Sequence, residues 1–119
     1  MEQRERDILA LERDFWLRGG GDPDYWRRHF AEDGLIVLSI GMMGKPEVVS
    51  VMEGERGWSD VEFDDVRWVH SPDTSIVGYE ARARSAGSGQ VDYQAMIASG
   101  YRRDDSGWQL IFHQQTPLV

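Results

Sequence analysis

Hydrophobic and polar positions alternate most regularly in the last segment of the chain, residues 107–118. Alternation with period two is typical of a strand with one face on a core, because successive side chains point to opposite sides of a sheet. We therefore predict a final strand here. Its inward row would begin with hydrophobic residues and end with an amide and a hydroxyl, in the order Trp108, Leu110, Phe112, Gln114 and Thr116. Such a row would close the core and place polar groups in a cavity.

The N-terminal part of the chain has the spacing of helices. Hydrophobic residues that lie three and four positions apart predict a helix over residues 2–18. Three glycines at residues 19–21 would end this helix in a flexible turn. A second helix would begin at Pro23, with Asp22 as its cap, and would end near Ala31.

The middle of the chain combines an unbroken apolar run with a broken alternation. Residues 35–40 are almost all apolar, which favours a strand buried on both faces. A short third helix would begin at Lys45. Residues 61–70 alternate like a strand, but the hydrophobic phase slips by one at Asp64 and Asp65. One extra residue resets which face points inward, so the slip predicts a β-bulge.

Two further strands are expected at residues 75–85 and 91–103, each preceded by turn residues. In the second of these strands, the side chains on one face would be Val91, Tyr93, Ala95, Ile97, Ser99 and Tyr101. The predicted order is helix, helix, strand, helix and four successive antiparallel strands.

Composition narrows the class of protein. A chain of 119 residues fits one domain, residues 1–119. A formal net charge of −8 argues against nucleic acid as a partner, because phosphates are bound mainly by Lys and Arg. The absence of Cys excludes disulfides and thiolate chemistry. We see neither a signal peptide nor an apolar run of the ~20 residues that a membrane helix needs, so we expect no membrane association and a cytoplasmic protein.

This order of elements, together with the segments AEDGLIVLS and RRDDSGWQLIFHQQTPL, resembles the nuclear transport factor 2-like superfamily. The chain looks like its small bacterial members, which are related to the SnoaL-like and ketosteroid isomerase groups. The resemblance implies an α+β fold, also described as cystatin-like, in which a cone-shaped, curved antiparallel sheet wraps around three helices. It also implies an internal pocket and, often, a homodimer formed on the outer face of the sheet. Fold alone does not supply a function.

The catalytic positions of the ketosteroid isomerase pattern have changed in this chain. In the register of that resemblance, the carboxylate base falls on Leu38, the acid that holds the enolate oxygen falls on Ser99, and the tyrosine of the first helix falls near Phe15. An alkyl group cannot take a proton. The aromatic residue of the second helix is retained as Phe30. We therefore expect a pocket without isomerase chemistry at these positions, and the catalytic residues, if any, remain unknown.

The pocket is predicted from the inward rows and from one loop. Gln114 would orient a ligand, or would instead be satisfied by backbone or water. Trp58 follows Gly57 in a glycine-containing loop that could cover the pocket. The predicted ligand-binding residues are Phe15, Trp26, Phe30, Leu38, Trp58, Ser99, Tyr101, Phe112 and Gln114.

The three histidines show no ligand spacing, so the sequence predicts no metal site, and no cofactor is expected. His113 falls on the outward row of the last strand, where a dimer interface or solvent would surround it. His29 is either a partly exposed structural residue or lies at the cavity edge. No GxSxG motif occurs, so acyl transfer has no support.

Three functions therefore stay open. The first is a homodimeric domain that binds a small apolar or aromatic molecule. The second is an isomerase, cyclase or dehydratase that uses pocket groups such as His29, Tyr101 or Gln114 as general acid and base. The third is an interaction module that acts through the outer face of the sheet.

Overall fold

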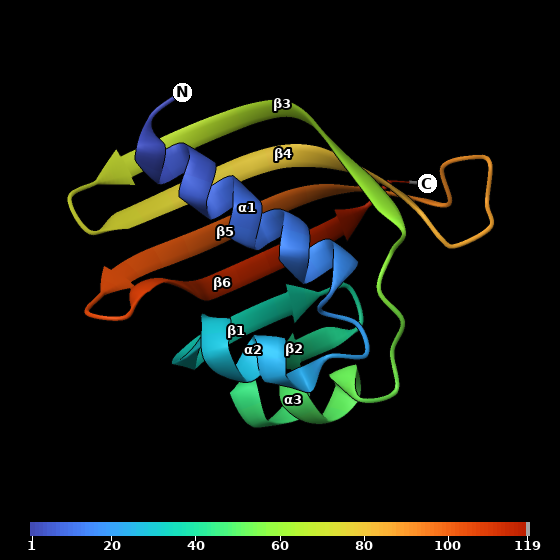
Figure 1. Cartoon of the computed structure of the whole chain (residues 1–119), viewed down its shortest axis with the longest axis horizontal. Helices are drawn as coiled ribbons and strands as arrows, with labels where there is room; N and C mark the ends of the chain where they lie inside the picture. Colours follow the sequence, from blue (N-terminus) through green and yellow to red (C-terminus); the bar gives the residue numbers. More distant parts are fainter. Residues whose placement is uncertain (119) are drawn as a thin grey trace.

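The computed structural model describes residues 1–118, which form three helices and six strands (Figure 1). Along the chain these are α1 (Gln3–Leu17), α2 (Pro23–His29), β1 (Phe30–Leu38), β2 (Gly41–Met43), α3 (Lys45–Met52), β3 (Asp60–Ser71), β4 (Thr74–Arg84), β5 (Tyr93–Asp104) and β6 (Gly107–Pro117). The predicted succession of helices and long strands is confirmed. The short strand β2 is an addition to the predicted elements.

The six strands form one sheet in the order β2-β1-β6-β5-β4-β3. Neighbouring strands are antiparallel except β1 and β6, which run parallel. Parallel neighbours need a long crossover connection, and here that connection contains every element from β2 to β5. The expected α+β fold, a curved sheet with three helices on it, is therefore confirmed, with a mixed sheet. Figure 1 shows the long strands β3 to β6 curving around the helices.

The helices all contribute to one core against the sheet. α1 runs across β4 and β5 (Figure 1), and its buried side chains include Ile8, Phe15 and Trp16. The ring of Phe15 packs edge-on against Tyr25 of α2, with centroids 4.8 Å apart, and lies 4.6 Å from the ring of Trp26. This aromatic contact, formed by side chains that bury large apolar areas, joins the first two helices.

Strand β1 corrects two predictions. The second helix ends at His29, and the chain continues directly as a strand from Phe30. The strand is not buried on both faces: Ile36 is 3% exposed, whereas Leu35 is 40% exposed. The helices cover only one side of the sheet, so the apolar residues on the other side of β1 lie on the outer face.

The glycine turn at residues 19–21 is tightly packed rather than open. A Cβ atom on Gly20 would lie 2.4 Å from the backbone carbon of Arg56, and one on Gly57 would lie 2.3 Å from the carbonyl oxygen of Leu17. Side chains at these positions would therefore separate two backbone segments. The packing fixes the segment between α3 and β3, residues 53–59, against the end of α1.

Two bulges set which residues face the helices. The predicted bulge in β3 is confirmed: the pairing with β4 shifts between Asp64 and Arg67, and Asp65 has a φ of 53°. A second bulge lies in β6, where Tyr101 pairs with Leu110 but Gly100 pairs with Phe112, which leaves Ile111 as the extra residue. This second bulge determines the lining of the cavity described below.

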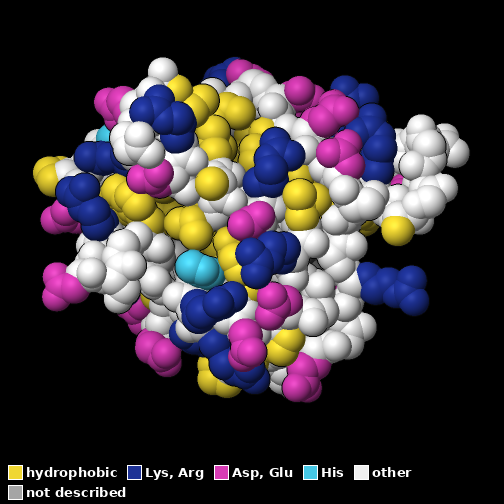
Figure 2. Space-filling model, viewed as in Figure 1, with side chains coloured by type: hydrophobic (Ala, Val, Ile, Leu, Met, Phe, Trp, Pro, Cys, Tyr) yellow, Lys and Arg dark blue, Asp and Glu magenta, His cyan; other side chains and the backbone are white. Residues whose placement is uncertain are grey.

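Acidic and basic side chains intermingle on the helix-bearing face, with hydrophobic side chains visible between them (Figure 2). That face shows no continuous basic patch of the kind that binds nucleic acid. Among the three helices of residues 1–118, none has the length and apolar character needed to cross a membrane.

Candidate functional site

A cavity of about 410 Å³ lies on the helix-bearing side of the sheet. Its lining comes from all three helices, from β1, β2 and β6, and from residues 53–59. Most of the lining is apolar, formed by Phe15, Trp16, Trp26, Ile36, Leu38, Ile40, Met43, Val51, Met52, Trp58 and Leu110. Its ionisable or amide side chains are Glu55, Arg56, His113 and Gln115. An apolar cavity with few polar groups is typical of small-molecule sites.

The burial of the lining residues separates a floor from a mouth. Leu110 and His113 are buried and form part of the floor, whereas Ile40 is 92% exposed and Arg56 is also exposed. The cavity is therefore entered past the β1–β2 turn and residues 53–59. A molecule that entered there would meet His113 at the far end.

Trp58 forms a fixed wall of the cavity. Its ring stacks on Tyr93 with centroids 5.6 Å apart and an angle of 12° between the rings. Its backbone N–H donates to the carbonyl oxygen of Trp16 at 3.1 Å. The close backbone packing of Gly57 on Leu17 holds the same segment.

A carboxylate lies buried behind the floor. Glu12 of α1 is 1% exposed and accepts hydrogen bonds from three hydroxyl groups. Tyr79 and Ser99 donate to Oε2, and Tyr101 donates to Oε1 at 2.5 Å. A buried charge is costly unless it is hydrogen-bonded, and three donors satisfy this requirement.

The two tyrosines keep their protons. Burial, and next the neighbouring charge of Glu12, raise the pKa values of Tyr79 and Tyr101 well above the usual range. Both phenols therefore act as donors to Glu12 at neutral pH. The indole N–H of Trp16 donates to the hydroxyl oxygen of Tyr79 at 2.8 Å, which links the cavity wall to the same network.

The direction of the remaining hydrogen bonds follows from Glu12. Ser99 donates its proton to Glu12 at 2.7 Å, so its oxygen must accept from the Nδ1–H of His113, also at 2.7 Å. The imidazole then has a lone pair on Nε2. The side-chain N–H of Gln115 donates to this Nε2 at 3.0 Å, and the hydroxyl of Tyr93 donates to the oxygen of Gln115 at 2.7 Å.

His113 is neutral in this setting. Burial lowers its pKa, and the charge of Glu12, whose Oε2 lies 3.8 Å from Nδ1, opposes that shift in part. A neutral imidazole with an unprotonated Nε2 can accept a hydrogen bond or a proton from a molecule in the cavity. The arrangement is not a nucleophilic triad, because Ser99 is fully buried and donates to Glu12.

Four of the predicted pocket residues line the cavity: Phe15, Trp26, Leu38 and Trp58. Ser99 and Tyr101 lie behind its floor, where both contact Glu12. Phe30 is fully buried beside Trp26, with ring centroids 5.6 Å apart, and is not part of the lining.

The predicted orientation of the last strand is wrong beyond Leu110. Because Ile111 is the extra residue of the bulge, Phe112 and Gln114 point to the outer face, while His113 and Gln115 point into the cavity. A Cβ atom on the neighbouring Gly100 would lie 3.6 Å from the Cβ atom of Phe112, which places both on the outer side. Gln114 therefore cannot orient a ligand in the cavity, nor can it act there as an acid or base.

Sequence reasoning missed Glu12, although a signal was present. Glu12 lies four residues after Ile8 and three before Phe15, which places a carboxylate within the apolar stripe of the first helix. Charged residues are rarely buried unless they are paired, so such a position indicates a polar partner in the core. His113 and Gln115 had no comparable signal, because the bulge that turns them inward leaves no mark in the residue types.

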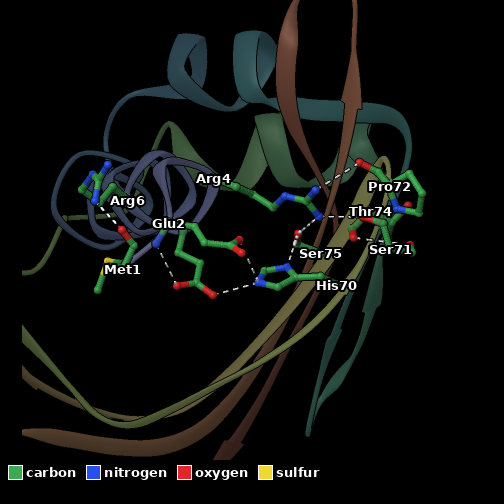
Figure 3. A network of polar contacts seen from close by, with 10 residues as sticks. Met1, Glu2, Arg4, Arg6, His70, Ser71, Pro72, Thr74 and Ser75 are labelled. Atoms are coloured by element: carbon green, nitrogen blue, oxygen red, sulfur yellow. Dashed lines mark hydrogen bonds and ion pairs between the residues drawn. The ribbon is translucent and has the colours of Figure 1, made fainter.

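The other two histidines lie outside the cavity. His29 packs on Tyr25, with ring centroids 4.5 Å apart, and its pKa is lowered mainly by burial. His70 joins α1 to β3: its Nε2 lies 2.8 Å from Glu5, and its Nδ1 lies 2.8 Å from the hydroxyl of Ser75 (Figure 3).

The group around His70 brings together side chains that can ligate metals. One atom each from Glu2, Glu5 and His70 lies within 4.8 Å of the others. Structural roles account for all three residues, because Glu2 and Glu5 form the capping box of α1 and Glu5 accepts a bond from His70. Arg4 brings a positive charge to the same place, where it donates to the carbonyl oxygen of Ser71 (Figure 3).

No family model matches the sequence, and no curated protein matches it. Solved structures do match. A nuclear transport factor 2-like protein from Cytophaga hutchinsonii has 18% identity and a TM-score of 0.76, over 99% of this chain and 100% of that one. A candidate ketosteroid isomerase from Parabacteroides distasonis has 13% identity and a TM-score of 0.77, over 93% of this chain and 85% of that one. A nuclear transport factor 2-like protein with a cystatin-like fold from Novosphingobium aromaticivorans has 14% identity and a TM-score of 0.70, over 98% and 80%. At these identities the likeness concerns the fold.

Proposed function

We propose that this chain, which has the nuclear transport factor 2-like fold, binds a small, largely apolar molecule in its cavity. The observation that carries the proposal is the apolar cavity of about 410 Å³ with His113 and Gln115 at its floor. This volume lies within the range of about 300 to 1,000 Å³ that is usual for ligand pockets. The apolar body of the ligand lies among the aromatic walls, and one polar group meets the floor.

The charge behind the floor restricts that polar group. Glu12 is a buried carboxylate 3.8 Å from Nδ1 of His113, and His113 is neutral. An anionic group at the floor would face this carboxylate without a cation, whereas a hydroxyl or a ring N–H can donate to Nε2. Neutral aromatic alcohols and heterocycles are therefore the favoured ligands, and carboxylates are disfavoured.

A thermal-shift panel tests this proposal. Neutral phenols, naphthols and azoles should raise the melting temperature, and carboxylates of matched shape should not. A ligand at 100 times its Kd stabilises the folded state by about 2.7 kcal/mol. Val51→Trp at the cavity mouth should weaken the shift. Ser50→Trp is the matched control, because the neighbouring Ser50 is exposed and does not line the cavity. The proposal fails if no compound stabilises the protein, or if both variants respond alike.

We also propose that two copies of the chain associate through the outer face of the sheet. Directly paired residues form a row across five strands on this face: Val69, Ile76, Gly100, Phe112 and Leu35. Val69 is 65% exposed and Ile76 is 45% exposed. Gly100 keeps the centre of the row flat. A flat apolar row can pack against its own copy about a twofold axis, so a second copy of this chain is the proposed occupant.

The oligomeric state measured by sedimentation tests this association. Ile76→Lys should convert the dimer to a monomer, because it places a charge within the apolar row. Ile40→Lys makes the same substitution at an exposed residue of the cavity mouth and should leave the dimer intact. A wild-type protein that stays monomeric at high micromolar concentration would refute the association.

A further inference from the structure

The imidazole of His113 is held in one orientation and one tautomer. Ser99 fixes Nδ1 at 2.7 Å, and Ser99 is itself held by Glu12 at 2.7 Å. The proton on Nδ1 leaves the lone pair on Nε2, at the floor of the cavity. A group fixed in this way has the geometry of a base that needs no rearrangement of its own before it reacts.

A positive charge on this imidazole would be balanced by the carboxylate of Glu12, which lies behind the cavity floor. If Nε2 takes a proton, the charge spreads to Nδ1, which lies 3.8 Å from Oε2 of Glu12, with the hydroxyl of Ser99 bridging the two. The tyrosines that hold Glu12 stay protonated, so they do not compete for the proton. The groups that face His113 are thus Glu12 from α1, Ser99 from β5 and Gln115 from β6, while Glu55 and Arg56 lie at the mouth.

We propose that Nε2 of His113 is a general base that removes a proton from a neutral, apolar molecule bound in the cavity, with Ser99 and Glu12 as positioning residues. The inference rests on the proposed binding function and adds a reaction to it. The substrate class is a small aromatic or cyclic molecule with one weakly acidic C–H or O–H group. The amide of Gln115, now bonded to Nε2, is the group that such a substrate displaces.

A probe that needs only a base makes the proposal testable without knowledge of the natural substrate. Nitrobenzisoxazole is a small, neutral, flat aromatic compound with an acidic ring C–H. His113 Nε2 forms a bond to this hydrogen as the C–H bond breaks. The electron pair of the C–H bond completes a nitrile, the ring N–O bond breaks, and the oxygen leaves as a coloured phenolate. Atoms and charge balance, with the proton left on His113.

The wild-type protein should cleave the probe faster than buffer alone does. The substitution His113→Gln should lower kcat/KM about 100-fold or more. His29→Gln is the matched control, since His29 is a partly buried histidine that lies outside the cavity. Its kcat/KM should equal that of the wild type. The rate should rise with pH and level off below neutral pH, because the pKa of His113 is lowered. In Glu12→Gln this apparent pKa should fall further, because the balancing charge is gone.

Two further measurements separate the possible failures. Binding of the matching nitroindazole, which has no N–O bond to break, reports on the cavity alone. If nitroindazole binds while wild-type protein and His113→Gln cleave the probe equally, general-base action is refuted and the binding function stands. If nitroindazole does not bind and no turnover occurs, both are refuted. Nitrogen NMR of wild-type His113 should show a protonated Nδ1 and a bare Nε2 near pH 7.5, and the reverse tautomer would overturn the proposal even if the variants fail to fold.

Discussion

Replacing Glu12 by glutamine tests the buried network most directly, because the change keeps the shape of the side chain and removes one acceptor. Oε2 accepts from two hydroxyls, Tyr79 and Ser99, whereas Oε1 accepts only from Tyr101. The amide of the variant is therefore expected to place its oxygen at the site with two donors. Its NH₂ group then faces the hydroxyl of Tyr101, whose O–H loses its acceptor.

The expected loss of stability in Glu12→Gln follows from the burial of the Tyr101 hydroxyl. Tyr101 is fully buried, and an unsatisfied buried polar group costs about 1 to 3 kcal/mol. The other two donors also lose a charged acceptor, so the total for Glu12→Gln should reach about 2 to 4 kcal/mol. A domain of 119 residues has a free energy of unfolding of about 6 to 18 kcal/mol, so the variant should still fold.

Tyr101→Phe removes the facing hydroxyl, so the double variant should be more stable than the two single costs predict. We expect a coupling energy of about 1 to 3 kcal/mol for Glu12 with Tyr101, and a smaller one for Glu12 with Tyr79. Urea unfolding measures both, since about 2 kcal/mol moves the midpoint by about 1 M at a typical slope. Costs that add within about 0.5 kcal/mol for the Tyr101 pair would refute the assigned direction of the network.

Two further outcomes follow from other parts of the structure. Because the pKa of His113 is lowered in the folded protein, the unfolded chain binds a proton just below pH 6.5 that the folded chain does not bind. The free energy of unfolding should therefore fall as the pH drops from about 6.5 toward the folded pKa. The slope should be at most about 1.4 kcal/mol per pH unit. His113→Gln should remove this share of the pH dependence in urea titrations, and a wild-type protein that gains stability on acidification over this range would contradict it. Gly57→Ala would place a Cβ atom 2.3 Å from the backbone oxygen of Leu17 and should cost about 1 to 3 kcal/mol. Gly54→Ala, with nothing within 4 Å, is the control, and equal melting temperatures for the two variants would show that the close packing is not needed.

The sequence was sufficient for the order of the helices and long strands and for the bulge in β3, because both depend on local spacing. The slip at Asp64 and Asp65 changes the phase of hydrophobic residues, and such a change is visible. In β6 the residues around the bulge, Ile111 and Phe112, are both hydrophobic, so the alternation that begins with Trp108 and Leu110 shows no break at the bulge. The inward row could therefore not be assigned beyond Leu110.

The site was only partly predictable for a related reason. Aromatic walls such as Phe15 and Trp26 follow from the apolar faces of the helices, and the structure places them in the cavity lining. The polar floor depends on contacts between residues far apart in the chain, since Glu12 and Ser99 are 87 positions apart. No local pattern encodes such a contact, although a charge within an apolar stripe indicates that some buried partner exists.

Because of the extra residue in β6, neighbouring residues of one short segment alternate between the cavity and the outer face of the sheet. His113 and Gln115 face the cavity, while Phe112 and Gln114 face the outer side of the sheet. A protein engineer can therefore change the chemistry of the cavity floor at two positions and the association surface at the two positions between them. If Ile111 instead paired with Gly100 in regular alternation, the two sets would be exchanged, which would put the imidazole outside and a phenyl ring on the side of Glu12. The pairing register of β6, rather than any single side chain, thus decides which surface each of these four residues serves.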